Sequence, residues 1–304
     1  MGGEKAEMKR AILLYNNQAG KGHASDKVEK IVAIFSEHGY KMTPCPIVFG
    51  ENPLDGYEDV DLAVVAGGDG TVNYIVNKMK EKGLNLTLGV LPAGTANDFA
   101  GALGMSRNIY KAAAQIAEGE VEKIDCGVVE QVNGNGEKLY FVNIFSFGIF
   151  TTTSQHTSDE MKHKLGRLAY GITGMHDLKN MHGIPLSITT DDESFYYPTL
   201  MALIFNGETA GRFRLARQSS IRDGMFDCLF LRKRNAFISA INMLAYLIGI
   251  KPKAVKFVRT KSITLVTPLN EDTDVDGQNG GRFPLRATCL ASELNIVCPK
   301  KSKN

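Results

Sequence analysis

A run of apolar residues that ends in a glycine-rich turn dominates the N-terminal part of the chain. Residues 62–66 are all apolar and do not alternate with polar residues, which is typical of a strand buried on both faces. The turn that follows, residues 67–70, holds three glycines around Asp69. Beyond it, apolar side chains keep the spacing of one helix face, at Val72, Ile75, Val76 and Met79. The pattern therefore predicts a strand, a glycine-rich turn and a helix.

This turn is suited to binding phosphate. Because glycines carry no side chain, an anion can approach the backbone closely, where the N–H groups of the turn and of the helix N-terminus point at it. A carboxylate at Asp69 would repel phosphates unless a cation lay between them, and Mg²⁺ takes oxygen ligands from carboxylate and phosphate together. The alternative is an ordinary tight turn in which Asp69 is the N-cap residue of the helix.

Strands and helices alternate up to about residue 120, which is typical of a parallel sheet with helices on both faces. In such sheets ligands bind beyond the carboxyl ends of the strands, so we expect the polar turns at residues 16–22, 67–73 and 92–98 to form one site. The other elements predicted here are strands at Ala11–Tyr15 and Leu86–Leu91, helices ending near His38 and Gly104, a helix at Ile109–Ala117, and a connection at residues 44–58 with a short strand at Ile47–Phe49.

Later segments are mainly strands, with a hairpin signal at residues 133–136, Asn-Gly-Asn-Gly. The predicted strands are Glu122–Glu130, Lys138–Phe147, Leu186–Thr190, Tyr196–Phe205, Met225–Leu231, Ser262–Val266, Arg282–Thr288 and Glu293–Cys298, and the helices are Glu160–Leu178 and Asn235–Ile248. This pattern indicates a largely antiparallel β-sandwich. We therefore expect an α/β nucleotide-binding domain at residues 8–125 and a β-sandwich domain at residues 126–304, with the active cleft between them and the last strand or tail free to return to the first domain.

Composition narrows the class of protein. A chain of 304 residues with 43% apolar residues and a net charge of +2 is ordinary for a globular protein, and the absence of a basic aromatic patch argues against nucleic acid as a partner. Five scattered cysteines without a Cys-x-x-Cys pair favour reduced thiols in a cytoplasmic protein. The longest apolar stretch, Ala236–Ile250, falls short of the ~20 residues of a membrane span, and we expect its helix to pack in the core.

Several motifs, in order along nearly the whole chain, resemble the diacylglycerol kinase catalytic-domain family, the soluble bacterial lipid kinases related to sphingosine and ceramide kinases. The matching segments are Gly67–Asn73, Pro92–Phe99, Gly166–Tyr170, Asn206-Gly207 with Gly211, Asp223–Asp227 and Asp276-Gly277. A Gly-Gly-Asp-Gly turn also occurs in NAD kinases and phosphofructokinases, whereas Pro-Ala-Gly-Thr-Ala-Asn-Asp-Phe is similar to the lipid branch specifically. The resemblance implies an NAD kinase or diacylglycerol kinase-like α/β domain followed by a lipid-binding sandwich.

The family resemblance also implies a function and its site. An ATP-dependent lipid kinase would bind ATP in the first domain and receive a lipid hydroxyl, such as that of diacylglycerol, from the second. By position, Asn16, Gly67, Gly68, Asp69, Gly70, Thr71, Val72, Asn73 and Thr95 would hold the nucleotide, with Asp69 facing the phosphates and Mg²⁺. A structural Mg²⁺ is implied at Ser220, Asp223 and Met225, the last through its backbone carbonyl. The implied partners are a lipid alcohol, transient peripheral contact with the inner membrane face, and a second copy in a homodimer.

One departure from the family pattern concerns the catalytic residues that the resemblance implies, Asp69, Asp276 and residue 278. The family has a glutamate, the expected proton acceptor, where this chain has Gln278. A glutamine can neither take a proton near neutral pH nor supply a negative charge to Mg²⁺. Tyr74 likewise replaces a usual glutamate. The first hypothesis is therefore a lipid kinase whose activity is impaired or retuned. The alternatives are a nucleotide-binding protein that acts as a sensor or scaffold, and an NAD kinase-like enzyme.

Overall fold

The computed structural model describes residues 8–16, 24–134, 136–148, 183–210, 213–216, 218–247, 250 and 252–300. The chain divides into two compact units. Unit 1 comprises residues 1–125 and 292–304, and unit 2 comprises residues 126–291. The chain therefore leaves unit 1 within strand β5 (Glu120–Gln131) and returns to it within strand β17 (Leu285–Cys298).

Unit 1 is a parallel sheet of five strands with helices between them. The strand order is β17–β4–β3–β1–β2, and every neighbouring pair is parallel. The elements are β1 (Lys9–Tyr15), α1 (Ala24–Glu37), β2 (Tyr40–Pro46), β3 (Leu62–Gly67), α2 (Asp69–Glu81), β4 (Thr87–Pro92), α3 (Asp98–Ala102) and α4 (Ile109–Glu118). All six residues of β3 are buried, as the unbroken apolar run predicts.

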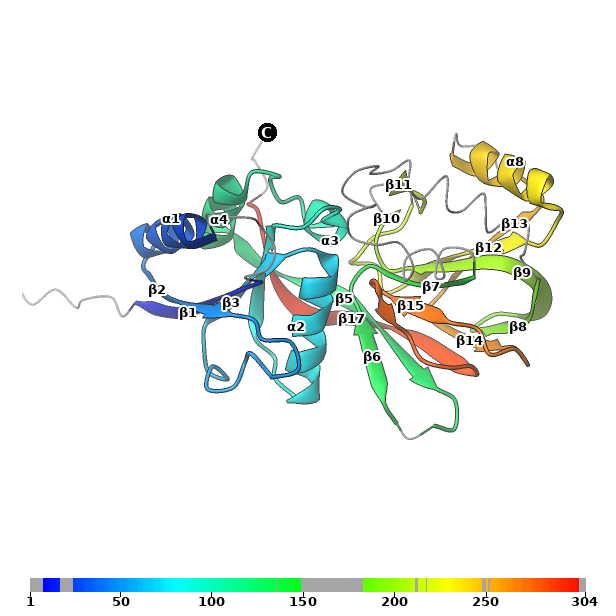
Figure 1. The fold of residues 1–304 in the computed structure, drawn as a ribbon, viewed down its shortest axis with the longest axis horizontal. Coiled ribbons are helices and arrows are strands. Elements are labelled where there is room, and N and C mark those ends of the chain that lie inside the picture. Colours follow the sequence, from blue (N-terminus) through cyan, green and yellow to red (C-terminus); the bar gives the residue numbers. More distant parts are fainter. Residues whose placement is uncertain are drawn as a thin grey trace, which may run out of the picture. The chain divides into compact units, whose positions relative to one another are not determined.

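The strand order of unit 1 reverses between β1 and β3. From β1 the chain moves outward to β2 through α1, and from β3 it moves in the opposite direction to β4 through α2. Because such crossovers are right-handed, α1 and α2 cover opposite faces of the sheet. Helices α1 and α4 lie side by side, while α2 packs on β3 and α3 (Figure 1). The point of reversal is where sheets of this kind leave a crevice for a ligand.

The structure confirms the strand–turn–helix pattern of unit 1 but corrects one segment. Residues 40–46 form strand β2, which the sequence did not predict, and residues 47–49 are not a strand. Pro44 and Pro46 obscured this strand, since proline cannot donate to a sheet ladder. They are tolerated here because β2 is the edge strand and pairs only with β1.

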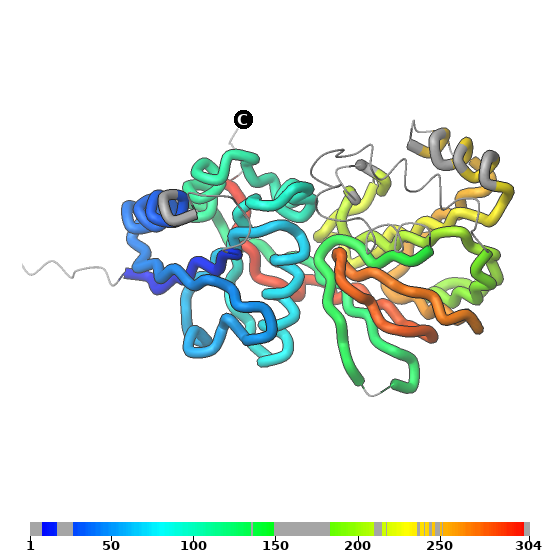
Figure 2. The backbone as a smooth tube through the Cα atoms, viewed as in Figure 1, coloured from blue at the N-terminus to red at the C-terminus, as the bar shows by residue number. Residues whose placement is uncertain are grey.

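Unit 2 is built from antiparallel strands. Seven follow the order β16–β15–β7–β9–β8–β14–β17, and β12 pairs with β9 and β13. Strands β5 and β6 pair in a hairpin, drawn in green in Figure 2. The elements are β6 (Lys138–Phe141), β7 (Ile144–Gly148), β8 (Ile184–Thr190), β9 (Ser194–Phe205), β10 (Thr209–Ala210), β11 (Phe213–Arg214), β12 (Phe226–Arg232), α8 (Ala236–Leu247), β13 (Val255–Thr260), β14 (Ser262–Val266), β15 (Thr273–Val275) and β16 (Gln278–Asn279).

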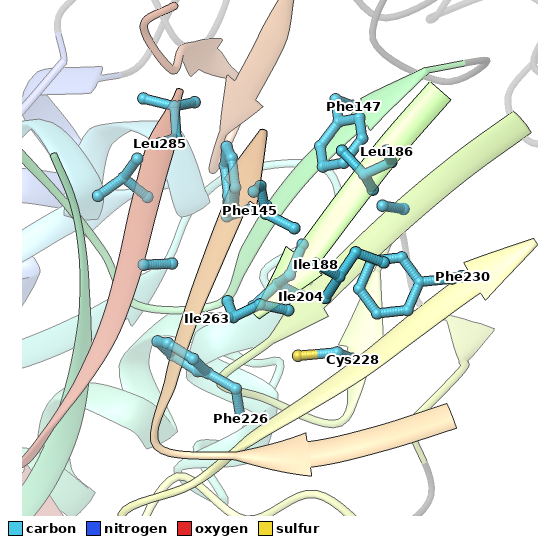
Figure 3. Packing of buried hydrophobic residues seen from close by; sticks show 14 of the residues in the cluster. Phe145, Phe147, Leu186, Ile188, Ile204, Phe226, Cys228, Phe230, Ile263 and Leu285 are labelled. Carbon is cyan, nitrogen blue, oxygen red and sulfur yellow. The ribbon is translucent and has the colours of Figure 1, made fainter. Parts of the chain in front are cut away.

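The long strand β9 contributes to a core on each of its faces. Ala202 and Ile204 belong to a cluster with Phe226 and Phe230 of β12, to which β7, β8, β14 and β17 also contribute (Figure 3). The intervening residues of β9 and β12 point the other way and form a second cluster with Leu200 and Ala216. Burial on both faces explains why these strands appear in the sequence as apolar runs without clear alternation.

Several boundaries of unit 2 differ from those expected. The single strand predicted at Lys138–Phe147 is broken after Phe141, and the two predicted at 282–288 and 293–298 are one strand, β17. Strands β13, β15 and β16 were not predicted. The helix expected at Glu160–Leu178 lies outside the described residues. The other predicted helix is α8.

Two expectations from composition can be compared with the fold. All five cysteines are present as thiols, and none of them is in a disulfide. Among the helices that the structure describes, none is long and apolar enough to cross a membrane.

Replacing Gly127 by alanine should destabilise unit 2. A Cβ atom at this position would lie 2.2 Å from ring atoms of Phe141, its cross-strand partner in the β5–β6 hairpin. That ring is fully buried and stacks on Phe226, so it has no space into which to move. Overpacking of this kind costs about 1–3 kcal/mol of unfolding free energy, measurable by chemical denaturation. Gly101→Ala is the matched control because its Cβ meets nothing within 4 Å. Equal stability of the two variants would contradict this prediction.

Candidate functional site

The turns that follow β3 and β4 are in direct backbone contact. The Ala93 N–H donates to the Gly67 carbonyl at 3.0 Å. A Cβ atom at Gly94 would lie only 2.3 Å from the Cα of Gly68, so the two backbones touch at glycines. No other residue at position 94 permits this approach without moving backbone. The contact between the two turns therefore requires glycine at positions 68 and 94, one in each sequence motif.

Helix α2 begins directly at this contact. Its first residue is Asp69, and its N-cap is Gly68, which has no side chain to cap the helix. The interpretation of Asp69 as the N-cap is therefore wrong. The Thr71 and Val72 N–H groups turn back to the Gly68 carbonyl, at 2.9 and 3.1 Å. Because no side chain caps this end of α2, the helix N-terminus can bind an anion.

The Asp69 carboxylate connects α2 to the turn after β4. It is partly buried, and its Oδ1 accepts the Phe99 N–H at 2.9 Å. Burial raises the pKa of the Asp69 carboxyl group. The Phe99 N–H lowers this pKa, because its hydrogen bond favours the charged form, and the negative charge of Asp98 raises it. Two carboxylates whose charges oppose each other in a buried setting are stabilised by a cation between them. This pair fits the hard oxygen ligands that Mg²⁺ takes from protein.

Asp98 was not singled out from the sequence, although it lies within the Pro92–Phe99 motif. It is the first residue of α3, it is buried, and its charge acts on Asp69. The preceding Asn97 has a left-handed backbone with φ of 55° and closes the turn through two hydrogen bonds of 2.8 Å with Gly94. Thr95 lies at the exposed tip of the turn that these two hydrogen bonds close. The Asn-Asp pair of the motif is the signal that could have identified Asp98.

The remaining nucleotide candidates lie around the same edge of the sheet. Tyr15 is the register partner of Ala66, so Asn16 and Gly67 follow neighbouring strands at the point where the strand order reverses. Residues 17–22 of the first polar turn lie outside the described residues. The side chains of Val72 and Asn73 are buried, and the Val72 N–H already donates to the Gly68 carbonyl. Unit 1 thus brings an amide-rich turn and a carboxylate pair to one edge of its sheet.

In unit 2, Asp276 holds a segment of backbone through its carboxylate. Its oxygens accept N–H groups from three consecutive residues, Val142 at 2.7 Å, Asn143 at 3.1 Å and Ile144 at 2.8 Å. The Asp276 N–H in turn donates to the Ile144 carbonyl at 3.0 Å. Asp276 and Gly277 both have positive φ, 49° and 88°, as a tight type I′ turn between β15 and β16 requires. The carboxylate therefore stabilises the break between β6 and β7.

Another sequence motif converges on the same segment. Asn206 is fully buried, and its side-chain amide donates to the Val142 carbonyl at 2.9 Å. A Cβ atom at Gly207 would lie 2.4 Å from the Asn143 side-chain oxygen. By contrast, Gln278 is exposed at the start of β16. The Asn206-Gly207 and Asp276-Gly277 motifs thus together fix residues 142–144.

The residues proposed to bind a structural Mg²⁺ form a closed turn. Asp223 Oδ1 accepts the Met225 N–H at 3.0 Å, Oδ2 pairs with the Arg259 guanidinium at 2.7 Å, and the Ser220 hydroxyl accepts the Arg222 N–H at 3.3 Å. Burial raises the pKa of nearby Asp227, which favours its neutral form. Within the described ranges no group of three or more His, Cys, Asp or Glu could hold a metal ion. The Asp223 carboxylate is thus engaged by the Met225 N–H and by Arg259, and Mg²⁺ at this turn stays a prediction.

Comparison with known proteins identifies the family. The model described as diacylglycerol kinase catalytic domain matches residues 10–129, and the one described as YegS C-terminal NAD kinase beta sandwich-like domain matches residues 143–298. Diacylglycerol kinases of Bacillus subtilis and Staphylococcus carnosus are 32% and 30% identical to the chain, across 97% of it and 98% and 97% of their own lengths. The chain belongs to the diacylglycerol kinase catalytic-domain family. It is therefore a kinase-type enzyme of a lipid kinase family.

Solved structures agree with this family at the level of fold. The crystal structure of a diacylglycerol kinase from Bacillus anthracis has a TM-score of 0.79 with this chain at 24% identity, covering 97% of this chain and 98% of that one. The Gly166–Tyr170 and Gly211 positions of the family pattern lie outside the described residues.

One departure from the family pattern, Tyr74, has a structural role. Its hydroxyl donates to the Glu51 carbonyl at 2.6 Å and accepts the Gly50 N–H at 3.2 Å, while its ring packs on Phe49 with centroids 5.1 Å apart. Tyr74 thus connects residues 49–51, which follow β2, to helix α2.

The contact between the two turns predicts that Gly94→Ala will disrupt nucleotide binding. The added Cβ must push the Gly68 backbone away, which separates Asp69 from Phe99 and Asp98. We expect MgATP affinity, measured by isothermal titration calorimetry, to fall at least tenfold, equivalent to about 1.4 kcal/mol. Gly101→Ala in the neighbouring helix should bind like the wild type, because its Cβ meets nothing. Unchanged affinity of a folded Gly94→Ala protein would refute the prediction.

Asp276→Asn should destabilise unit 2 although the two side chains have the same shape. The amide keeps one acceptor oxygen and directs an NH₂ group at backbone N–H donors, which leaves buried donors without a partner. The expected loss of unfolding free energy is about 1–3 kcal/mol, measured by denaturant titration. Asp272→Asn, at an exposed position of the same segment, is the control and should change little. A loss no larger than that of the control would contradict the anchoring role.

Proposed function

We propose that this protein transfers the γ-phosphate of ATP to the hydroxyl group of a lipid such as diacylglycerol. The observation that carries the proposal is the glycine-to-glycine contact that brings the Asp69–Asp98 carboxylate pair to the open start of α2. The family membership supports the lipid hydroxyl as acceptor. Transient contact with a membrane surface follows from an acceptor of this kind.

In this proposal unit 1 binds the nucleotide phosphates. The backbone amides at the start of α2 and in the turn after β4 would hold phosphate oxygens, with Asn16 and Thr95 at the margins of the site. Asp69 and Asp98 would hold the Mg²⁺ that accompanies ATP, and bound Mg²⁺ supplies positive charge toward the transferring phosphoryl group. The Phe99 N–H keeps Asp69 in position through its 2.9 Å hydrogen bond.

The contribution of unit 2 is to present the acceptor hydroxyl. Asp276 acts here as a positioning residue, because its carboxylate already accepts three backbone N–H groups. Gln278 occupies the position of the family's glutamate, is exposed, and cannot accept a proton. General-base assistance contributes roughly 10²–10⁴ in rate, and phosphoryl transfer depends mostly on positioning and charge stabilisation. Transfer without that glutamate is therefore slow rather than impossible.

Gln278 is also the observation that favours a second candidate, a nucleotide-binding protein without kinase activity that serves as a sensor or scaffold. Such a protein would bind MgATP without releasing ADP in response to lipid. It would keep the unit 1 site intact.

The test measures phosphate transfer from MgATP to a panel of lipid alcohols in mixed micelles, with NAD as a further acceptor. The wild type should phosphorylate at least one lipid and not NAD. Gln278→Glu should raise turnover on the same lipid by roughly two to four orders of magnitude, the range of general-base assistance. Gln278→Ala is the control for loss of the side chain and should stay near the wild-type rate.

The outcomes separate the candidates. Lipid phosphorylation by the wild type supports the kinase. Turnover by Gln278→Glu alone supports the sensor or scaffold. Formation of NADP, or ATP binding without transfer by any of the three proteins, would contradict the proposed lipid kinase.

A further inference from the structure

Basic residues are concentrated in one stretch of unit 2. Residues 228–270 contain eight lysines and arginines and neither aspartate nor glutamate, although the whole chain has a net charge of only +2. The rest of the chain is therefore net acidic. The stretch runs from β12 through α8 into β13 and β14.

Helix α8 lies between the basic residues of this stretch and has no charged residue itself. Tyr246 connects the helix to the rest of unit 2. Its ring packs on the second core cluster, formed by β9 and β12, and its hydroxyl donates a hydrogen bond to the Leu215 carbonyl. Ile238 and Ile241, one helical turn apart, are 43% and 50% exposed, and Ile250 just beyond the helix is 56% exposed. The expected core packing of this helix thus holds for Tyr246 and Ser239 but not for Ile238 and Ile241. An uncharged apolar face of α8 is open, at the periphery of unit 2 (Figure 1).

Three cations that flank α8 in the chain are exposed and form no ion pair with the part of the chain that the structure describes. Arg232 and Arg234 precede the helix, and Lys253 follows it. The Arg232 guanidinium lies over the ring of Tyr197. Farther along β13, Lys256 pairs with Glu193 at 2.9 Å, and Arg259 pairs with Asp223.

We infer that α8 docks on an anionic lipid bilayer, with Ile238 and Ile241 in the interfacial layer and the flanking cations on lipid headgroups. An apolar helix face bordered by lysine and arginine is what interfacial helices present to membranes, and each basic residue near an anionic surface strengthens binding. A second copy of this chain would bring the same cations against themselves. The inference rests on the membrane contact of the proposed function and deepens it by assigning that contact to α8, although docking itself needs neither ATP nor an acceptor lipid.

The first test uses the absence of tryptophan from the chain. Ile241→Trp introduces a single tryptophan on the exposed face of α8, and Val266→Trp introduces one at a similarly exposed apolar position of β14. Each tryptophan is excited at a wavelength that the ten tyrosines do not absorb. Both proteins are titrated with vesicles of phosphatidylglycerol and phosphatidylcholine that contain no diacylglycerol, and with vesicles of phosphatidylcholine alone. Emission of the Ile241→Trp protein should shift to the blue and be quenched by brominated lipid only with the anionic vesicles. Emission of the Val266→Trp protein should stay unchanged.

The second test separates the apolar and the charge contributions by co-sedimentation with the same vesicles. Ile238→Asp with Ile241→Asp should weaken binding at least tenfold, and Arg234→Glu with Lys253→Glu should weaken it at least fivefold and reduce its salt dependence. Val266→Asp and Lys41→Glu are matched controls at exposed positions and should bind like the wild type. Circular dichroism verifies that each variant is folded.

Several results would overturn the inference. These are an unshifted emission of the Ile241→Trp protein, equal binding to both kinds of vesicle, or unimpaired binding of the folded aspartate variant. A change in oligomeric state caused by the isoleucine substitutions, without a change in vesicle binding, would identify α8 as a contact between copies instead. Because the vesicles hold no acceptor and no ATP is present, these outcomes do not depend on whether the lipid kinase proposal holds.

Discussion

The candidate site of unit 1 depends on the contact between Gly68 and Gly94. Two backbone turns can approach this closely only where neither carries a side chain. That approach allows the Phe99 N–H to reach Asp69, and it brings the Asp98 charge near enough to raise the Asp69 pKa. The open start of α2 lies at the same place because its N-cap is a glycine. The proposed phosphate site and the proposed cation site therefore have one structural origin.

Much of unit 1 could be predicted from the sequence because its signals are local. Buried parallel strands appear as apolar runs, and each is followed by its own turn residues. Strand β2 was not predicted because its prolines are compatible only with an edge strand. The position of a strand in the sheet depends on its neighbours and cannot be seen in the local sequence. In unit 2 the break after Phe141 could not be predicted, since it is stabilised by Asp276, more than 130 residues away. Strands of two or three residues, such as β15 and β16, carry no periodicity at all.

The same distinction applies to the functional residues. The glycine motifs can be recognised from a few neighbouring residues. The environment of Asp223, by contrast, depends on Arg259, which lies 36 residues further along the chain. An uncharged apolar helix such as α8 looks the same in sequence whether it is covered or open. Only the fold shows that Ile238 and Ile241 are exposed, and only then does the surrounding run of cations become meaningful.

The central claim is that Asp69 and Asp98 form a cation-dependent phosphate site, and the Mg²⁺ dependence of ATP binding tests it most directly. Calorimetric titration of the wild type should give at least tenfold tighter ATP binding with Mg²⁺ than with a chelator, because the cation relieves the repulsion between carboxylates and phosphates. In Asp69→Asn most of that difference should disappear. Equal ATP affinity of the wild type with and without Mg²⁺ would contradict the account.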